Sequence, residues 1–181
     1  LKYLVPATET NIWHLRMRMG GKPLLVDHSL YDYYERFYDS HPEWFAQGYD
    51  DMPVPPQLCY SNQDLIDQVA QDARDYFDGK REFTVWPMTL LENGSDFYPI
   101  VPMDDNRWCK CSACQSKLDP NRTGVFSSGE ASNYIWGFIN AVAQKIASAY
   151  PDKYVVGLAY HQHAFWPDEI NLASNVAVQF C

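Results

Sequence analysis

Tyr154-Val-Val-Gly-Leu-Ala-Tyr160 is an apolar run, and we predict that it forms a β-strand. The residues before it favour a helix that begins at Ser127-Ser128, runs to Tyr150 and is ended by Pro151. A second run, Asn175-Val-Ala-Val-Gln-Phe180, is predicted to be the next strand. This half of the chain therefore combines strands with a long helix.

The first half of the chain shows the same alternation. The predicted elements are strands at residues 24–26, 57–60 and 83–86 and helices at residues 11–19, 31–45 and 62–77, the second of these helices interrupted at His41-Pro42. Ser61 or Asn62 caps the last of these helices, and Gly79 ends it. Strands that alternate with helices are typical of a parallel sheet joined by right-handed crossovers.

Both an open doubly wound sheet and a β/α barrel satisfy this alternation. Polar or thiol groups follow the strands, at Asp27-His28, at Cys59 and at His161. This distribution favours a barrel, whose active face lies at the C-terminal ends of its strands. About four or five strands are too few to close an eight-stranded barrel. We therefore predict one α/β domain over residues 1–181, a partial (β/α) TIM-type barrel with parallel strands and a long cysteine-containing loop at residues 87–128.

The composition is typical of a soluble globular chain, since 46% of the 181 residues are hydrophobic and 20% are charged. The formal net charge of -9 argues against a nucleic-acid partner, because such proteins present a basic surface to phosphate. No apolar run approaches the roughly 20 residues that a membrane-spanning helix needs. We expect neither nucleic acid nor a membrane as a partner.

Three of the five cysteines, Cys109, Cys111 and Cys114, lie within a stretch of six residues. Thiolates at that spacing suit a tetrahedral metal ion such as zinc, and Cys59 is the candidate for a fourth ligand. Four thiolates would close the coordination shell, so the site would be structural and would brace the long loop. A disulfide and unliganded thiols are the alternatives. Cys181 is expected to stay outside this site.

Several segments resemble, in order and spacing, a bacterial family. They are His-Pro-Glu-Trp-Phe at 41–45, Gln-Leu-Cys-Tyr-Ser-Asn at 57–62, Asp-Asp-Asn-Arg-Trp-Cys-Lys-Cys-Ser-Ala-Cys at 104–114, Phe-Ile-Asn-Ala-Val-Ala at 138–143, Gly-Leu-Ala-Tyr at 157–160 and Asn-Val-Ala-Val-Gln-Phe-Cys at 175–181. The chain is similar to domain-of-unknown-function family 4838, whose members resemble the catalytic barrels of glycoside hydrolases such as α-glucuronidases and hexosaminidases. The resemblance implies carbohydrate chemistry. Because the family's barrel is longer than this chain, it also implies the middle part of a glycoside-hydrolase-like barrel.

Glycoside hydrolysis uses two carboxyl groups, one of which holds a proton for the leaving group. Asp105 is our first candidate for that acid and Asp104 its nearest rival, because adjacent like charges raise the pKa of one partner. Glu92 is a candidate for the second carboxyl group, although it adjoins the turn signal Asn93-Gly94. A solvent-exposed Asp-Asp-Asn turn is the alternative for the acidic pair. The second carboxylate could also lie outside this chain.

Aromatic residues make up 15% of the chain, and flat amphipathic rings stack well on the apolar faces of sugars. Trp86 and Trp108 are candidates for such stacking; the alternative is that large rings fill the core. Candidates for hydrogen bonds to sugar hydroxyls are His28, Tyr160 and His161, each with a structural role as the alternative.

We therefore expect a glycoside-hydrolase-like domain that binds or cleaves a polysaccharide-derived carbohydrate. Acid/base carboxylate chemistry would take place at the C-terminal ends of the strands, with no cofactor required for catalysis and with structural zinc as the candidate metal. The alternatives are a non-catalytic carbohydrate-binding module and a zinc-braced structural module. We expect a secreted or periplasmic parent, and a truncated barrel whose exposed strand edges favour self-association.

Overall fold

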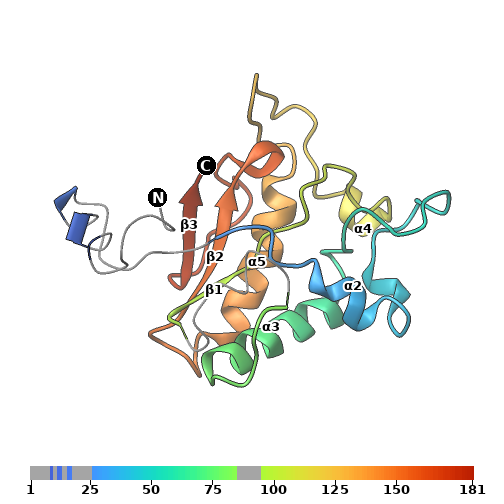
Figure 1. Ribbon diagram of the computed structural model, residues 1–181. Helices are drawn as coiled ribbons and strands as arrows, with labels where there is room; N and C mark the ends of the chain where they lie inside the picture. The colour runs from blue at the N-terminus through green and yellow to red at the C-terminus, as the bar shows by residue number, and fades with distance from the viewer. Residues whose placement is uncertain (1–8, 10–11, 14–15, 18–25, 85–94) are drawn as a thin grey trace.

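A parallel β-sheet forms the centre of the computed structural model, which describes residues 9, 12–13, 16–17, 26–84 and 95–181 (Figure 1). Its strands are β1 (Phe97–Pro99), β2 (Tyr154–Ala159) and β3 (Val176–Phe180), side by side in that order. In the central strand, Val155 pairs with Tyr98 of β1 and with Val176 of β3. Both pairs are parallel, so the C-terminal ends of the strands lie at one end of the sheet. The predicted α/β class is confirmed.

Two long helices, α3 (Gln63–Phe77) and α5 (Ser132–Ile146), pack against each other and against one face of the sheet (Figure 1). The start of α3 is as predicted, because Asn62 Oδ1 accepts a hydrogen bond of 3.1 Å from the backbone N–H of Leu65. Gly79 follows its last turn with a φ of +73°, a conformation that favours glycine. The sequence pattern therefore fixes both ends of this helix.

The close packing of α5 on β2 depends on Gly157. A Cβ atom at this position would lie 2.6 Å from Cζ3 of Trp136 and 2.7 Å from Cδ1 of Ile139. The indole of Trp136 is buried, and its Nε1 donates a 2.9 Å hydrogen bond to the backbone oxygen of His163. The helix therefore also holds the segment that follows β2.

The side chains of the strands alternate between the two faces of the sheet, as expected for period-two geometry. Tyr98 and Val155 belong to the large core that includes α3 and α5. The opposite face has a second, smaller cluster of buried residues, formed by Val26, Val101, Val156 and Leu158. Both faces of the sheet thus carry buried apolar side chains.

A buried ion network joins α2 (Asp32–Phe37) to α3. Asp72 accepts hydrogen bonds from Arg36 Nη1 at 2.6 Å and Nη2 at 2.8 Å, and from the Tyr33 hydroxyl at 2.6 Å. Arg81 pairs with both Asp32 and Asp72. Asp32 and Asp72 are each only 1% exposed, so their charges depend on these partners.

Several predicted elements in the middle of the chain are shorter than expected. The helical segment predicted over residues 31–45, with its interruption at His41-Pro42, consists of α2 and the short 3-10 helix η1 (Pro42–Trp44); the break lies where predicted, since His41 has a φ of -136° before a proline. Residues 57–60 are buried but form only an isolated antiparallel bridge between Leu58 and Phe45, not a strand of the sheet. The helix predicted from residue 127 begins at Ser132 and ends at Ile146.

The sheet differs from the prediction in its first strand. β1 lies inside the predicted loop at residues 87–128, and its three residues, one of them a proline, are too few to show a periodic pattern. Phe83 and Thr84 lie outside any strand, while residues 85–86 and most of the elements predicted at 11–19 and 24–26 fall outside the described residues. Over the described part of the chain, the sheet is open and has three strands.

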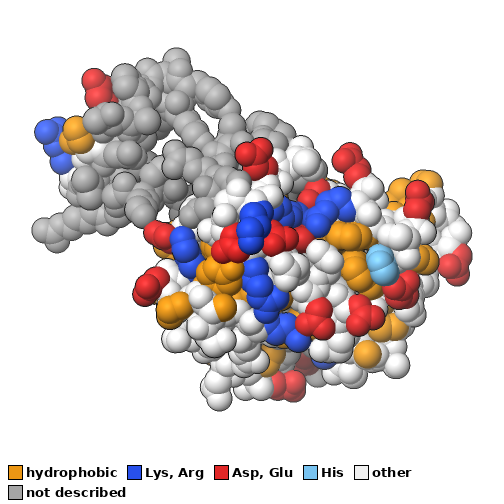
Figure 2. Space-filling view, turned by 90° about the horizontal axis from the view of Figure 1, so that it is seen from below, with side chains coloured by type: hydrophobic (Ala, Val, Ile, Leu, Met, Phe, Trp, Pro, Cys, Tyr) orange, Lys and Arg blue, Asp and Glu red, His pale blue; other side chains and the backbone are white. Residues whose placement is uncertain are grey.

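The two ends of the sheet have different surroundings. At the end toward which β2 and β3 point, Figure 1 shows a long loop between α4 (Ser112–Gln115) and α5. Figure 2, a view from below, shows the opposite end, where acidic and basic side chains lie next to one another. Within the described residues, no helix is both long enough and apolar enough to cross a membrane.

Candidate functional site

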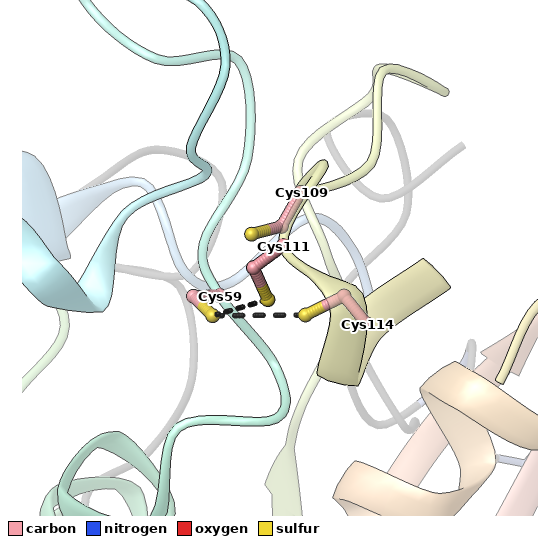
Figure 3. A group of neighbouring side chains, drawn as sticks. All are labelled: Cys59, Cys109, Cys111 and Cys114. Carbon is pink, nitrogen blue, oxygen red and sulfur yellow. Dashed lines mark hydrogen bonds between the residues drawn. The ribbon is translucent and has the colours of Figure 1, made fainter. Parts of the chain in front are cut away.

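Cys59 meets the three closely spaced cysteines of a later segment in one cluster (Figure 3). We call Cys59, Cys109, Cys111 and Cys114 the cysteine cluster. Their sulfur atoms all lie within 4.8 Å of one another, and Cys59 Sγ is 3.6 Å from Cys114 Sγ and 3.8 Å from Cys111 Sγ. Cys111 is half-buried and the other three are buried. The four predicted metal ligands are thus brought together.

Backbone hydrogen bonds position three of these thiols, those of Cys59, Cys111 and Cys114. The N–H of Cys59 donates to the oxygen of Trp44 at 2.8 Å, which fixes the segment after the Phe45–Leu58 bridge. Cys111 precedes α4, and its oxygen accepts from the N–H of Cys114 at 3.1 Å. This single helical turn therefore presents two sulfur atoms toward Cys59.

The thiols of the cluster differ in their readiness to ionise. Hydrogen bonds from Cys109 and Cys59, and one of 3.0 Å from the Tyr134 hydroxyl, lower the pKa of Cys114. Hydrogen bonds with Cys114 raise the pKa of Cys109 to about 11, and those with Cys109 and Cys114 raise the pKa of Cys59 as well. Without a cation, the cluster favours one thiolate among thiols; a metal ion would favour ionisation of all four.

The geometry of the cluster fits a four-coordinate metal ion. For metal–sulfur bonds of about 2.3 Å, the edge of a regular tetrahedron is about 3.8 Å, close to the measured sulfur–sulfur distances of 3.6 and 3.8 Å. A disulfide would need a sulfur–sulfur distance of about 2.05 Å. All five cysteines lie in the described residues and are free thiols. The cluster could therefore hold one metal ion.

A second group of polar side chains meets at the C-terminal end of the sheet. We call His28, Asp104 and Tyr160 the polar rim. Asp104 Oδ1 accepts a 3.3 Å hydrogen bond from the Tyr160 hydroxyl and lies 3.7 Å from His28 Nε2. The side chain of Asp104 is 60% exposed, while that of His28 is 19% exposed. Three segments of the chain thus bring an acid, an imidazole and a phenol together.

The hydrogen bonds of the polar rim determine the tautomer of His28. Its Nδ1 contacts the backbone oxygen of Pro102, and because a carbonyl only accepts, Nδ1 must carry the proton. Nε2 then faces Asp104 and can accept a proton. The negative charge of Asp104 is the largest cause that raises the pKa of Tyr160, so this hydroxyl stays protonated and donates.

Asp105 does not have the properties predicted for the acid. Arg107 Nε lies 3.0 Å from both of its carboxylate oxygens, and the N–H of Arg107 donates to Oδ1 at 2.7 Å. These hydrogen bonds lower the pKa of Asp105, so the increase expected from its neighbour Asp104 is wrong for this residue. A group that must hold a proton near neutrality needs the opposite shift.

The other candidates lie in different environments. Trp108 is buried, and its Nε1 donates a 2.7 Å hydrogen bond to Oε1 of Gln162. His161 is exposed, and its ring lies 5.9 Å from that of Tyr160. Glu92 and Trp86 fall outside the described residues.

The strand does not continue through His161 and His163, because β2 ends at Ala159 and residues 161–163 form the 3-10 helix η3. His163 is 4% exposed, and neither of its ring nitrogens has a hydrogen-bond partner within the described residues. Burial is the main cause that lowers its pKa to about 4, so this imidazole is neutral near pH 7.

The sequence analysis did not identify two residues that shape the site. The Tyr31 hydroxyl accepts a 3.1 Å hydrogen bond from the backbone N–H of Asp104, and Arg107 occupies the carboxylate of Asp105. The pairing of Arg107 with Asp105 could have been predicted, because the two residues are only two positions apart. The contact of Tyr31 with Asp104 could not, because these residues are 73 positions apart.

Comparison with known proteins gives one result that bears on identity. No curated protein and no solved structure matches the chain. One family model matches residues 8–181, almost the whole length of the chain. The chain therefore belongs to the family described as Domain of unknown function (DUF4838).

Proposed function

We propose that this chain is part of a glycoside-hydrolase-like barrel that binds or cleaves a carbohydrate at the polar rim. The observation that carries the proposal is the convergence of Asp104 with His28 and Tyr160 at the C-terminal end of the sheet. Asp104 replaces Asp105 as the preferred carboxylate, since the carboxylate of Asp105 is hydrogen-bonded to the side chain of Arg107. Active sites of β/α barrels lie at this end of the strands.

The order of the strands supports the barrel architecture. β1, β2 and β3 are neighbours in the order in which they occur in the chain. The segment with Ser29 extends this order on the other side of β1, because the N–H of Ser29 donates to the oxygen of Val101 at 3.1 Å. A barrel adds parallel strands consecutively, whereas a doubly wound sheet reverses its order at a switch point.

The chemistry of the polar rim suits sugar hydroxyls. Asp104 can accept two hydrogen bonds from a ligand at its exposed oxygens, and the Tyr160 hydroxyl can donate or accept. His28 can take a proton at Nε2 while Nδ1 stays bound to Pro102. The same three groups could move a proton to or from a glycosidic oxygen, which is the acid/base step of glycoside hydrolysis.

The test of this proposal is carbohydrate binding by residues 1–181. We expect a panel of neutral and acidic oligosaccharides to contain at least one ligand, and Asp104→Asn to weaken its binding about tenfold or more, as for a hydrogen bond to a charged group. Asp39→Asn is the matched control, because Asp39 is also exposed but follows α2. Isothermal titration calorimetry gives both affinities. Equal losses in the two variants, or no binding by the unmodified chain, would overturn the proposal.

We also infer that the metal ion of the cysteine cluster is a structural zinc. Four sulfur ligands within 4.8 Å of one another support it, because a shell with four protein ligands leaves no position for substrate. Zinc there would tie the segment of Cys59 to the loop that also carries Asp104 and Asp105. Elemental analysis of protein purified without added metal should give about one zinc per chain.

A further inference from the structure

A surface cavity lies next to the polar rim and has no role in the site described so far. Its volume is about 210 Å³, and its lining includes Phe126, Ser127, Ser128, Glu130, His161 and Gln162. Pockets that enclose a drug-sized ligand measure roughly 300–1,000 Å³. A cavity of this size, open to solvent, suits one ring of a longer ligand better than a whole ligand.

Exposed apolar side chains surround this cavity. We call Val125, Phe126, Phe165 and Trp166 the aromatic ridge. Val125 and Phe126 are each 91% exposed, Trp166 is 65% exposed and Phe165 is 39% exposed. The two segments touch, since a Cβ at Gly124 would lie 3.2 Å from the ring of Phe165. Apolar groups gathered in this way mark a surface that meets a ligand or a partner.

The polar lining of the cavity is held in place by the backbone. The N–H of Ser128 donates to the oxygen of His161 at 2.8 Å, and the N–H of Ala131 donates to that of Gln162 at 2.8 Å. His161 has a φ of 46°, a left-handed conformation that costs free energy in a non-glycine residue and is concentrated at functional sites. These bonds fix the polar groups before a ligand arrives.

The side chains of the cavity offer hydrogen bonds suited to hydroxyl groups. Gln162 Nε2 donates to Glu130 Oε2 at 3.0 Å, and Gln162 Oε1 accepts from buried Trp108 at 2.7 Å. Within the described residues, Gln162 is the partner of the Glu130 side chain, so Glu130 Oε1 can accept from a ligand. Rings beside fixed acceptors and hydroxyls match a pyranose, which has apolar faces and a hydroxyl edge.

The cavity continues directly into the polar rim. His161 lines the cavity, its ring lies 5.9 Å from that of Tyr160, and the Tyr160 hydroxyl lies 3.3 Å from Asp104. Glu130 is the only carboxylate in the lining, and the lining contains no lysine or arginine. The neighbouring cation, Arg122, is already engaged, because it donates to the backbone oxygen of Trp166 at 2.6 Å and pairs with Asp168 at 3.3 Å. An acidic sugar would therefore meet negative charge at both Glu130 and Asp104, while the charge of Arg122 is shared with Asp168.

We infer that this cavity and the aromatic ridge form a second sugar-binding subsite that continues the polar rim and selects neutral over acidic oligosaccharides. The inference rests on the proposed function, because it assigns a further ring of the same carbohydrate to this surface. Phe126 and Trp166 stack on the sugar faces, and Glu130 accepts a hydroxyl hydrogen.

The experiment measures binding of neutral tetrasaccharides of glucose, xylose, mannose and N-acetylglucosamine, and of tetragalacturonate, to residues 1–181. We expect Phe126→Ala and Trp166→Ala each to weaken binding of a neutral ligand roughly 3- to 10-fold. Tyr154→Ala is the matched control, because this partly exposed aromatic residue begins β2 at the opposite end of the sheet. Amide chemical shifts should change at residues 126–130 and 161–162 when the neutral ligand is added.

Glu130→Gln tests the selectivity. It removes the charge and keeps a side-chain acceptor, so we expect it to raise the affinity for tetragalacturonate relative to the neutral ligands. An unchanged ratio of the two affinities would overturn the proposed selectivity.

Further outcomes separate the inference from the proposed function. Binding that depends on Asp104 but is unaffected by Phe126→Ala and Trp166→Ala would overturn the second subsite and leave the polar rim intact. Absence of binding by the unmodified chain would overturn both. Variants that abolish only self-association, measured by analytical ultracentrifugation, would identify the aromatic ridge as a protein contact and overturn the inference.

Discussion

The cysteine cluster and the polar rim both take side chains from the stretch between β1 and α4, but they differ in burial and in composition. The cluster contains four identical soft ligands, three of them buried, with sulfur atoms within 4.8 Å of one another. The polar rim contains three different groups around an Asp104 side chain that is 60% exposed. A closed set of thiols can bind an ion and nothing larger, whereas the open set can bind a ligand. This difference is the reason why we propose a structural role for the cluster and a ligand-binding role for the polar rim.

The largest effect is expected from removing a ligand of the cysteine cluster. Cys59→Ser should lower the bound zinc from about one per chain to none and should lower the melting temperature strongly, because structural zinc contributes on the order of 10 kcal/mol of binding free energy to folding. Elemental analysis and calorimetry measure the two effects. Cys181→Ser is the control, since this cysteine is exposed. A Cys59→Ser protein that keeps its zinc would contradict the structural role.

A second effect should come from a buried polar group that needs no metal. Asp72→Asn breaks the double hydrogen bond with Arg36 and weakens the support of Arg81, so the free energy of unfolding should fall by about 3 kcal/mol. Chemical denaturation of both proteins measures this loss. A change below about 1 kcal/mol would show that the network adds little to stability.

The same pair of proteins should show a pH dependence. Burial acts to raise the pKa of Asp72, but the hydrogen bonds from Arg36 and the charge of Arg81 outweigh it, and the pKa is lowered. The stability that Asp72 contributes is therefore fully present above its unfolded pKa of about 3.9 and is lost as the pH falls through its folded pKa. The stability difference between wild type and Asp72→Asn should shrink in that acidic range. A difference that grows on acidification would contradict the sign of the shift.

A smaller effect distinguishes the two neighbouring aspartates. Asp105→Asn should slightly lower the melting temperature, because it loses the charged pair with Arg107, and should leave carbohydrate affinity unchanged. Asp104→Asn should lower the carbohydrate affinity and leave the melting temperature nearly unchanged. Parallel calorimetry and ligand titration of the two variants test this assignment. Loss of affinity in Asp105→Asn alone would restore Asp105 as the main carboxylate.

The smallest effect is expected at His28. His28→Gln keeps a polar side chain but removes the group that can take a proton at Nε2, 3.7 Å from Asp104. We expect roughly a threefold loss of carbohydrate affinity, as for a neutral hydrogen bond. Isothermal titration calorimetry of the variant and the wild type measures this loss. An unchanged affinity would remove His28 from the site.

The elements with strong local patterns could be predicted from the sequence. The 15-residue helix α3 has a cap at Asn62, an apolar face and a glycine stop, and the apolar runs of β2 and β3 stand out from their surroundings. β1 could not be predicted, because its partner Tyr154–Val156 is 57 residues away in the sequence and its own three residues carry no pattern. Its existence depends on tertiary pairing.

The cysteine cluster could be predicted because one residue type at short spacing has few uses, and the fourth ligand follows from the same chemistry. The choice between Asp104 and Asp105 could not, because adjacent carboxylates are equivalent in sequence. The Arg107 side chain and the Tyr160 hydroxyl separate them in space.

The missing Cβ at Gly157 has a consequence beyond packing. It lets α5 approach β2 closely enough for Trp136 to donate a hydrogen bond to the backbone oxygen of His163, just after the strand. One added methyl group would force the two layers apart and tilt that stretch, although nothing at the ligand-facing end had been altered. A substitution at Gly157, in the interior, would then change the proposed ligand affinity of residues at the surface.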